Sequence, residues 1–315
     1  MTNLTIQILT KNNEKTIKNS LTSAKNTGAK LFLADLGSTD KTTEICEKNG
    51  VPFERFIDLP HDQVRNILAE KSKTKWQMRL DPWETIIRGY KELNNLTEPA
   101  YYCSIIENGK SLRKEIRIWD KEHIKHTNPV FEMINYKTES ELNLVLSSSG
   151  HFDFDYIKSC LEKWKSEKPF ISQPVYYESC ILLSEGNYEE FLKRSEHYMI
   201  LDNSRSMSSV MNHYYYALVQ VIYKKNAKKA MQNINLCLSE KPLMAEFWCL
   251  QGDICYHLLR EFKKAKIFFE NAILLGSRRL KSDKWPLEIE KYKEYPEKMI
   301  KSCDSILDEK SYYGA

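Results

Sequence analysis

Polar and acidic residues follow three short apolar segments near the start of the chain. These segments cover residues 4–9 (LTIQIL), 30–34 (KLFLA) and 75–80 (KWQMRL), and the residues after them include Thr10, Lys11, Asn12, Asp35 and Asp81. If the segments are parallel strands, these residues lie at the carboxyl ends, where α/β sheets bind their ligands.

The elements that would position these residues alternate along the chain. Helical periodicity is found over residues 14–25 and 61–71. Another helix is expected after a cap at Ser38 or Thr39, ending at Asn49-Gly50, and residues 51–56 read as a further strand. Strands that alternate with helices of this length predict βαβ units and a parallel sheet.

The pattern changes after about residue 100. Residues 101–106, 114–119 and 142–147 read as strands without long helices between them, which predicts a mixed or antiparallel extension of the sheet. After about residue 155 we expect only amphipathic helices. The predicted fold is therefore an α/β domain with a parallel sheet at 1–155, followed by an all-α domain at 156–315.

The helical part repeats with a period near 35 residues. Its clearest unit runs from Trp248 to Ala272 and resembles a tetratricopeptide repeat with one extra residue before Ala265. Small residues at 252, 265 and 272 would let paired helices approach, while Phe269 fills the space between them. A plain helical bundle is the alternative. Residues 278–301 lack the repeat spacing, so we expect a C-terminal capping segment there.

Composition limits the classes of function. Hydrophobic residues make up 42% and charged residues 29% of the chain, as in soluble proteins with a core. The net charge of +4 is too mild to indicate a nucleic-acid partner. The apolar segments are too short for a membrane span, which needs about 20 residues, or for a secretory signal. The eight cysteines are scattered without a C-x-x-C pair, so we expect a cytoplasmic protein without disulfides or structural zinc.

Taken together, four blocks of sequence resemble a family-2 glycosyltransferase of the GT-A fold. They are TKNNEKTIKNSLTSAK (10–25), LADLGSTDKTTEICEKNGV (33–51), DQVRNILAEKSKTKWQMRLDPWE (62–84) and RIW…NPVFEMI (117–134). The branch is similar to bacterial transferases that carry C-terminal tetratricopeptide repeats, including the peptide S-glycosyltransferases of glycocin biosynthesis. The motifs cover roughly residues 4–150, where the resemblance implies a Rossmann-like, nucleotide-binding domain of the GT-A fold, and the architecture covers the remainder.

The resemblance implies roles in donor binding for four residues. Asp35 would accept a hydrogen bond from uracil or another base, and Thr10 and Asn12 would shape the base pocket. Arg65 matches the arginine of the family's R-N element, and a guanidinium fork suits a diphosphate. Without the resemblance, Asp35 would be read as an acid satisfied by backbone amides at a helix start, and Arg65 as a solvated helix residue.

Asp81 marks a departure from the family. Relatives have an L-D-A-D-E run here, whereas this chain reads Leu80-Asp81-Pro82-Trp83-Glu84, so Trp83 replaces the second acid. Three interpretations remain open. Asp81 and Glu84 could share a Mn²⁺ or Mg²⁺ ion. Alternatively, Asp81 could hold sugar hydroxyls while cationic side chains stabilise the departing diphosphate, or the site could be inactive.

Glu132 matches the position of the family's general base. It stands in PVFEMI where relatives commonly read V-H-E, so Phe131 replaces a histidine. An apolar neighbour tends to raise the pKa of a carboxyl group, which suits a base that works near neutrality. A surface glutamate is the alternative reading.

The sequence and the resemblance together predict an inverting glycosyltransferase. It would move a sugar from a nucleotide-sugar donor, a UDP-sugar in the first instance, to a peptide, protein or glycan acceptor. The repeats would hold the acceptor or mediate self-association into a homo-oligomer. The rival is a catalytically degenerate protein that retains the fold as a binding or scaffold module.

Overall fold

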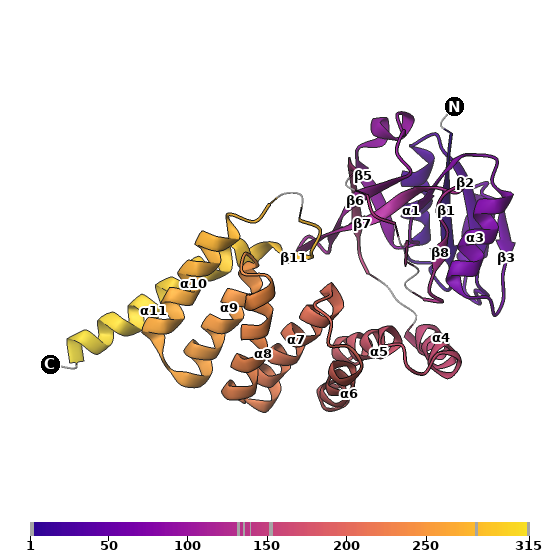
Figure 1. The fold of residues 1–315 in the computed structure, drawn as a ribbon. Helices are drawn as coiled ribbons and strands as arrows, with labels where there is room; N and C mark the ends of the chain where they lie inside the picture. The colour runs from indigo at the N-terminus through magenta and orange to yellow at the C-terminus, as the bar shows by residue number, and fades with distance from the viewer. Residues whose placement is uncertain are drawn as a thin grey trace. The chain divides into compact units, whose positions relative to one another are not determined.

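The structure is a computed structural model that describes residues 3–130, 133–134, 136–138, 140–150, 154–280 and 283–313. The chain forms two units that divide between Trp164 and Lys165, whereas the sequence placed the boundary at residue 155. Tyr156 explains part of the difference, because its ring stacks on His61 with 5.3 Å between ring centroids and so belongs with the first unit. In Figure 1 the ribbon colour runs from indigo at the start of the first unit to yellow at the end of the second.

The first unit begins with the predicted alternation of strands and helices. The elements are β1 (Leu4–Thr10), α1 (Ile17–Lys25), β2 (Lys30–Asp35), α2 (Thr42–Lys48), β3 (Phe53–Arg55), α3 (His61–Lys71) and β4 (Trp76–Arg79). The four strands are parallel and lie in the order β3-β2-β1-β4. All residues of β1 are buried, as expected for a central strand covered on both faces.

Helices cover the two faces of this sheet, and β1 contributes to both layers. Ile8 packs in one cluster with Ile17 and Leu21 of α1. Its neighbour Leu9 packs with Val64 and Leu68 of α3 in another cluster. Successive side chains of a strand point to opposite faces, so α1 and α3 lie on opposite sides of the sheet. This layering leaves the carboxyl ends of the strands as the edge where loops gather.

The second half of the first unit extends the sheet with mixed strand directions. Its elements are β5 (Glu84–Arg88), the 3₁₀ helix η1 (Tyr90–Asn94), β6 (Ala100–Glu107), β7 (Ser111–Asp120), β8 (His126–Thr127), β9 (Met133–Ile134), β10 (Glu141–Ser148) and α4 (Phe154–Glu167). β7 pairs antiparallel with β4 and β6, while β10 runs parallel to β6 and antiparallel to β5. The predicted mixed extension is confirmed, and β5 is a strand that the sequence did not predict.

The second unit is almost entirely helical. Its elements are α5 (Gln173–Ser184), α6 (Tyr188–Leu201), α7 (Met207–Val219), η2 (Gln220–Lys224), α8 (Ala227–Glu240), α9 (Ala245–Asp253), η3 (Ile254–Leu259), α10 (Phe262–Gly276), β11 (Leu287–Glu288), η4 (Ile289–Tyr292) and α11 (Glu294–Tyr313). Consecutive helices pack in pairs, α5 with α6, α7 with α8 and α9 with α10. Across the described ranges, the structure contains no helix with the length and apolar character needed to cross a bilayer.

The repeat spacing has a local structural cause. The second helices of the pairs begin at Tyr188, Ala227 and Phe262, which are 39 and 35 residues apart. The first helices α7 and α9 each end in a π-helical segment, η2 and η3, closed by a residue with positive φ, Lys225 or Arg260. A π-helical turn takes up one residue more than an α-helical turn. We attribute to η3 the extra residue before Ala265.

Small residues let α9 and α10 approach, as predicted. A Cβ atom on Gly252 would lie 2.6 Å from the ring of Phe269. Phe269, Ala265 and Ala272 are fully buried. Cys303 of α11 belongs to the same cluster, so the C-terminal helix covers α10 in the manner expected of a capping segment.

Candidate functional site

Three predicted site residues meet at the carboxyl edge of the parallel strands. Thr10 and Asp35 are direct partners in the register of β1 and β2. The amide of Leu36 donates to the Thr10 carbonyl at 2.8 Å, and the amide of Leu80 donates to the Gln7 carbonyl at 3.1 Å. Asp81 therefore leaves β4 at the level where β1 ends. The structure brings Thr10, Asp35 and Asp81 to one edge of the sheet, although the three residues are far from one another in the sequence.

The loops after β1 and β2 are bonded to each other through Asn12. Its side-chain oxygen accepts hydrogen bonds from the Thr39 amide at 2.8 Å and the Thr39 hydroxyl at 3.3 Å. The backbone amide of Asn12 donates to the Ser38 hydroxyl at 3.1 Å. Asn12 is exposed and has φ 53°, a left-handed conformation that asparagine tolerates. Asn12 thus holds two loops together at the surface of the edge.

The predicted cap at Ser38 or Thr39 is wrong. These residues bond to Asn12, and α2 begins later, at Thr42. The N-cap position is Lys41, and the carboxylate of Asp40 before it accepts from the Thr42 amide at 2.9 Å and from the Thr42 hydroxyl at 2.5 Å. These hydrogen bonds keep the pKa of Asp40 below its ordinary value although burial opposes them.

Asp35 is buried and its carboxylate has two protein partners. One oxygen accepts from the Ser38 amide at 3.0 Å, and the other accepts from Nε of Arg55 at 3.0 Å. Arg55 ends β3 directly beside Asp35, and its side chain is 52% exposed. The amide bond matches the structural reading of Asp35, and the exposed guanidinium adds a cation that the sequence interpretation missed. Thr10 is buried, and its hydroxyl donates to the Asn13 side chain at 2.9 Å.

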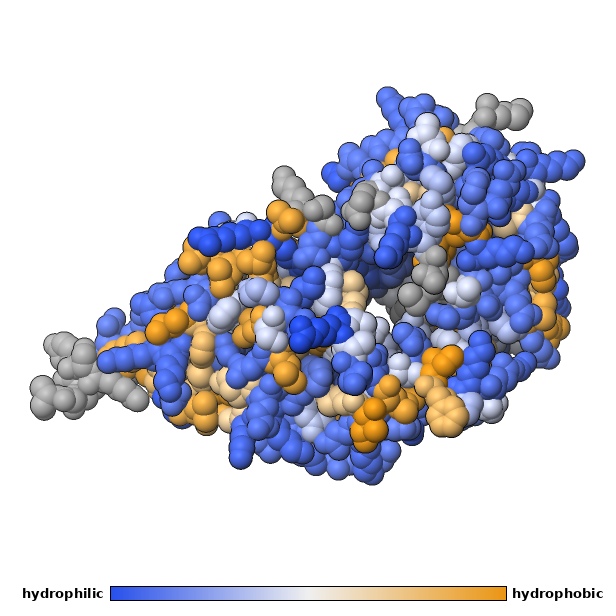
Figure 2. Space-filling model, viewed as in Figure 1, coloured by the Kyte–Doolittle hydropathy of each residue, from blue (hydrophilic) through white to orange (hydrophobic). Residues whose placement is uncertain are grey.

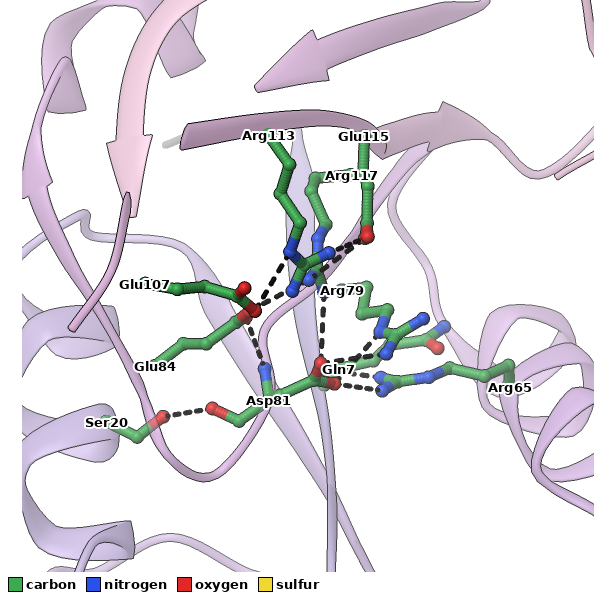
Figure 3. A network of polar contacts seen from close by, with 10 residues as sticks. All are labelled: Gln7, Ser20, Arg65, Arg79, Asp81, Glu84, Glu107, Arg113, Glu115 and Arg117. Atoms are coloured by element: carbon green, nitrogen blue, oxygen red, sulfur yellow. Dashed lines mark hydrogen bonds and ion pairs between the residues drawn. The ribbon is translucent and has the colours of Figure 1, made fainter. Parts of the chain in front are cut away.

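Asp81 is the centre of a network of arginines (Figure 3). Oδ1 accepts from Nη2 of Arg65 at 3.3 Å and from Nε of Arg79 at 2.9 Å. Oδ2 accepts from Nη2 of Arg79 at 2.8 Å and from Nη1 of Arg117 at 3.2 Å. Arg79 is therefore a bidentate partner. Burial alone would raise the pKa of Asp81, but the guanidinium groups of Arg79, Arg117 and Arg65 hold it well below its usual range.

Glu84 lies beside Asp81 and is fully buried. Its Oε1 accepts from Nη2 of Arg117 at 2.8 Å, and its Oε2 accepts from the Asp81 amide at 3.0 Å. The Glu84 amide in turn donates to the Asp81 carbonyl at 2.9 Å, which closes the turn that contains Trp83. Burial raises the pKa of Glu84 above its ordinary value, against the opposing attraction of Arg117.

A second layer of charges lies on β7 and at the end of β6. Arg117 contacts Glu115 at 3.1 Å, and Arg113 contacts Glu107 at 3.0 Å and also Glu115. Residues 113, 115 and 117 alternate along the strand and so share one face. The side chains of Glu107 and Glu115 are 33% and 38% exposed, so water screens this layer more than the inner one. The alternating charges in Arg113-Lys114-Glu115-Ile116-Arg117 were the sequence signal that could have revealed it.

The R-N element ties α3 to its surroundings. Arg65 is 1% exposed, and its Nη1 donates to the Gln7 carbonyl at 2.7 Å. The side chain of Asn66 exchanges two hydrogen bonds of 3.0 Å with the backbone of His126. Both residues therefore hold α3 in place. The guanidinium of Arg65 is buried against Asp81. Its contact with a diphosphate stays a prediction.

The loop after β1 carries a further cation that the sequence interpretation left without a role. Nζ of Lys11 lies 4.4 Å from the ring centroid of Tyr156. The same ring stacks on His61, whose backbone amide donates to the Pro129 carbonyl at 3.0 Å. Glu132, the predicted general base, lies outside the residues that the structure describes.

A metal ion at the predicted site would need carboxylate oxygens of Asp81 and Glu84 that are not already held by cationic side chains. All four carboxylate oxygens accept hydrogen bonds, and the inner partners are three guanidinium groups, which repel a divalent cation. Within the described ranges, no group of three or more His, Cys, Asp or Glu residues could hold a metal ion. In this arrangement Asp81 and Glu84 do not fit a Mn²⁺ or Mg²⁺ ion.

No family model matches the chain, and no curated protein matches it. Among solved structures, the chain is similar to residues 41 to the end of MamA from Desulfovibrio magneticus RS-1, with 15% identity, a TM-score of 0.36, and 49% of this chain and 82% of that chain covered. It is similar to the first TPR of Spaghetti (RPAP3) bound to an HSP90 peptide, with 12% identity, a TM-score of 0.35, and 44% and 93% covered. It is also similar to the Sgt2 TPR domain from Aspergillus fumigatus, with 11% identity, a TM-score of 0.36, and 45% and 82% covered.

Proposed function

We propose that the chain is an inverting glycosyltransferase whose first unit binds a nucleotide sugar, a UDP-sugar in the first instance. The observation that carries the proposal is the meeting of Thr10, Asp35 and Asp81 at the carboxyl edge of parallel strands in the order β3-β2-β1-β4. That order begins the dinucleotide-binding sheet, and its ligands bind at this edge. The motifs that resemble family-2 glycosyltransferases lie on the same loops.

The edge offers groups suited to the two parts of a nucleotide. Asn12 and the Asp35–Arg55 pair lie on neighbouring loops, where polar groups can hydrogen-bond a base. Lys11 and Arg79 supply positive charge near the strand ends, which a departing diphosphate requires. Under this proposal Glu132 is the base that takes the proton from the acceptor as it attacks the anomeric carbon.

The second unit is proposed to hold the acceptor, a peptide, protein or glycan, or to mediate self-association. Its support is the apolar surface that the helices leave exposed, seen as the orange areas on the second unit in Figure 2. Among the exposed apolar residues are Ile267 and Leu274, which are seven positions apart on α10 and are each 53% exposed. Exposed apolar patches commonly mark interaction sites.

A first experiment tests donor binding. Thermal shift of the full chain against UDP-glucose, UDP-N-acetylglucosamine, GDP-mannose and the free nucleotides should show stabilisation by the UDP series. Asn12→Gly keeps the left-handed backbone and removes the bonds to Thr39, so we expect affinity to fall about three- to tenfold, the range of one hydrogen bond. The control is Asn108→Gly, which replaces another exposed asparagine of positive φ (49°) in the turn between β6 and β7. Equal affinities in the two variants would remove Asn12 from the site.

The second candidate function is a binding or scaffold module on a retained fold. Two features favour the scaffold. Both carboxylate oxygens of Asp81 already accept hydrogen bonds from Arg79, and Trp83 stands in place of an acid. Slow release of UDP from a bound UDP-sugar supports the enzyme. Absence of both stabilisation and release across the donor panel would leave the scaffold as the better account.

A further inference from the structure

We infer that Arg79, held by Asp81, takes the place of a divalent cation, so that this site binds the diphosphate of a nucleotide without a metal. The inference rests on the proposed function and names the group that meets the diphosphate. Arginine side chains surround Asp81 and Glu84, where the sequence predicted a metal ion.

The inner network consists of Asp81, Glu84 and the three arginines that contact them. Asp81 and Glu84 contribute two negative charges, and Arg65, Arg79 and Arg117 contribute three positive charges, which leaves one positive charge in excess. Two carboxylates with one divalent cation would be neutral. The inner network therefore already supplies more positive charge than a metal-loaded pair of acids would, at the place where β4 ends.

The outer layer reduces this excess but does so from more exposed positions. Glu107, Glu115 and Arg113 add one net negative charge. Their side chains are 22% to 38% exposed, whereas those of Arg117 and Glu84 are fully buried. Water screens charges at the surface more strongly than buried ones. By formal charge the two layers cancel, so the positive character around Asp81 depends on the stronger screening of the more exposed outer carboxylates by water.

Of the three inner arginines, Arg79 has the most exposed side chain and is the one we assign to the diphosphate. The side chains of Arg65 and Arg117 are 1% and 0% exposed, so they hold Asp81 from inside the fold. The side chain of Arg79 is 15% exposed. Its Nε and Nη2 donate to the two oxygens of Asp81 at 2.9 and 2.8 Å, which fixes the plane of the guanidinium (Figure 3). A guanidinium positioned in this way suits phosphate oxygens.

Calorimetric titration of the full chain with UDP tests the inference. The wild-type protein should bind UDP with the same affinity in EDTA and in Mn²⁺, and the affinity should fall as salt is raised. Arg79→Met should weaken binding in EDTA by about ten- to hundredfold, the range of a lost charge-assisted hydrogen bond. Arg88→Met is the control, because Arg88 ends β5 and is exposed. If Arg79→Met does not fold, Arg79→Lys keeps the charge without the fork and should still lose affinity.

The outcomes separate the inference from the proposed function. UDP binding that requires Mn²⁺ would overturn the inference and leave the nucleotide site standing. Wild-type affinity in Arg79→Met would also overturn it. No UDP binding under any condition would overturn the proposed function itself.

Discussion

Replacing Arg117 by methionine is expected to lower the free energy of unfolding of the first unit by about 3–5 kcal/mol, the usual cost of removing one partner from a buried charge network. Arg117 is fully buried and bonds to both Asp81 and Glu84. Methionine fills a similar volume but leaves Glu84 Oε1 without its guanidinium donor. The loss can be measured by urea unfolding of the full chain, fitted with one transition for each unit.

Arg113→Met is the matched control for this change. Arg113 points to the same face of β7, four residues away, but its side chain and its partner Glu107 are 22% and 33% exposed. Partly exposed ion pairs contribute little, so we expect a loss of about 1 kcal/mol or less. A double variant with Arg117→Met and Glu84→Gln should recover part of the loss, because it removes the stranded charge. Equal losses in the two single variants would contradict the buried network.

The second large effect is a dependence of stability on pH in the second unit. Glu246 of α9 is buried, and its carboxylate accepts from the Glu288 amide at 2.7 Å and the Tyr292 hydroxyl at 3.0 Å. The residues that follow α10 are thereby tied to α9. Burial raises the pKa of Glu246 from 4.5 to about 7, although these hydrogen bonds and the charge of Arg279 oppose the rise.

A raised pKa in the folded state means that folding favours the protonated acid. The stability from Glu246 is therefore fully present below about pH 4.5 and is lost as the pH rises to about 7. At 1.36 kcal/mol per pKa unit the change is on the order of 3 kcal/mol. Glu246→Gln cannot ionise, so its unfolding free energy should vary less over this range than that of the wild type.

Urea unfolding between pH 4.5 and 7.5 measures this difference. Glu294→Gln is the control, because Glu294 is an exposed acid at the start of α11 and should give the wild-type curve. Parallel curves for the wild type and Glu246→Gln would show that Glu246 does not control the pH dependence.

The order of the first elements could be predicted from local patterns. β1, β2 and β4 are short apolar segments between amphipathic helices, and their carboxyl ends carry Thr10, Asp35 and Asp81. These features depend on neighbouring residues alone. The repeat period could be predicted for the same reason, and the extra residue before Ala265 corresponds to a π-helical turn.

The charge network around Asp81 could not be predicted in this way. Arg79 is near Asp81 in sequence, but Arg117 comes 36 residues after Asp81, on a strand whose place beside β4 depends on the order of the sheet. Sequence alone therefore favoured a metal between Asp81 and Glu84, where the fold inserts guanidinium groups. Arg55 was missed for a similar reason, since its pairing with Asp35 follows from the register of β2 and β3.

Hydrogen exchange of the full chain with and without UDP tests the central claim most directly, because it reports where on the chain the nucleotide binds. A nucleotide at the carboxyl edge of the parallel strands should slow exchange of the loop amides at residues 11–14, 36–41 and 83–84 and leave those of α5 to α10 unchanged. Protection confined to the helices of the second unit, or no protection anywhere at saturating UDP, would contradict the account.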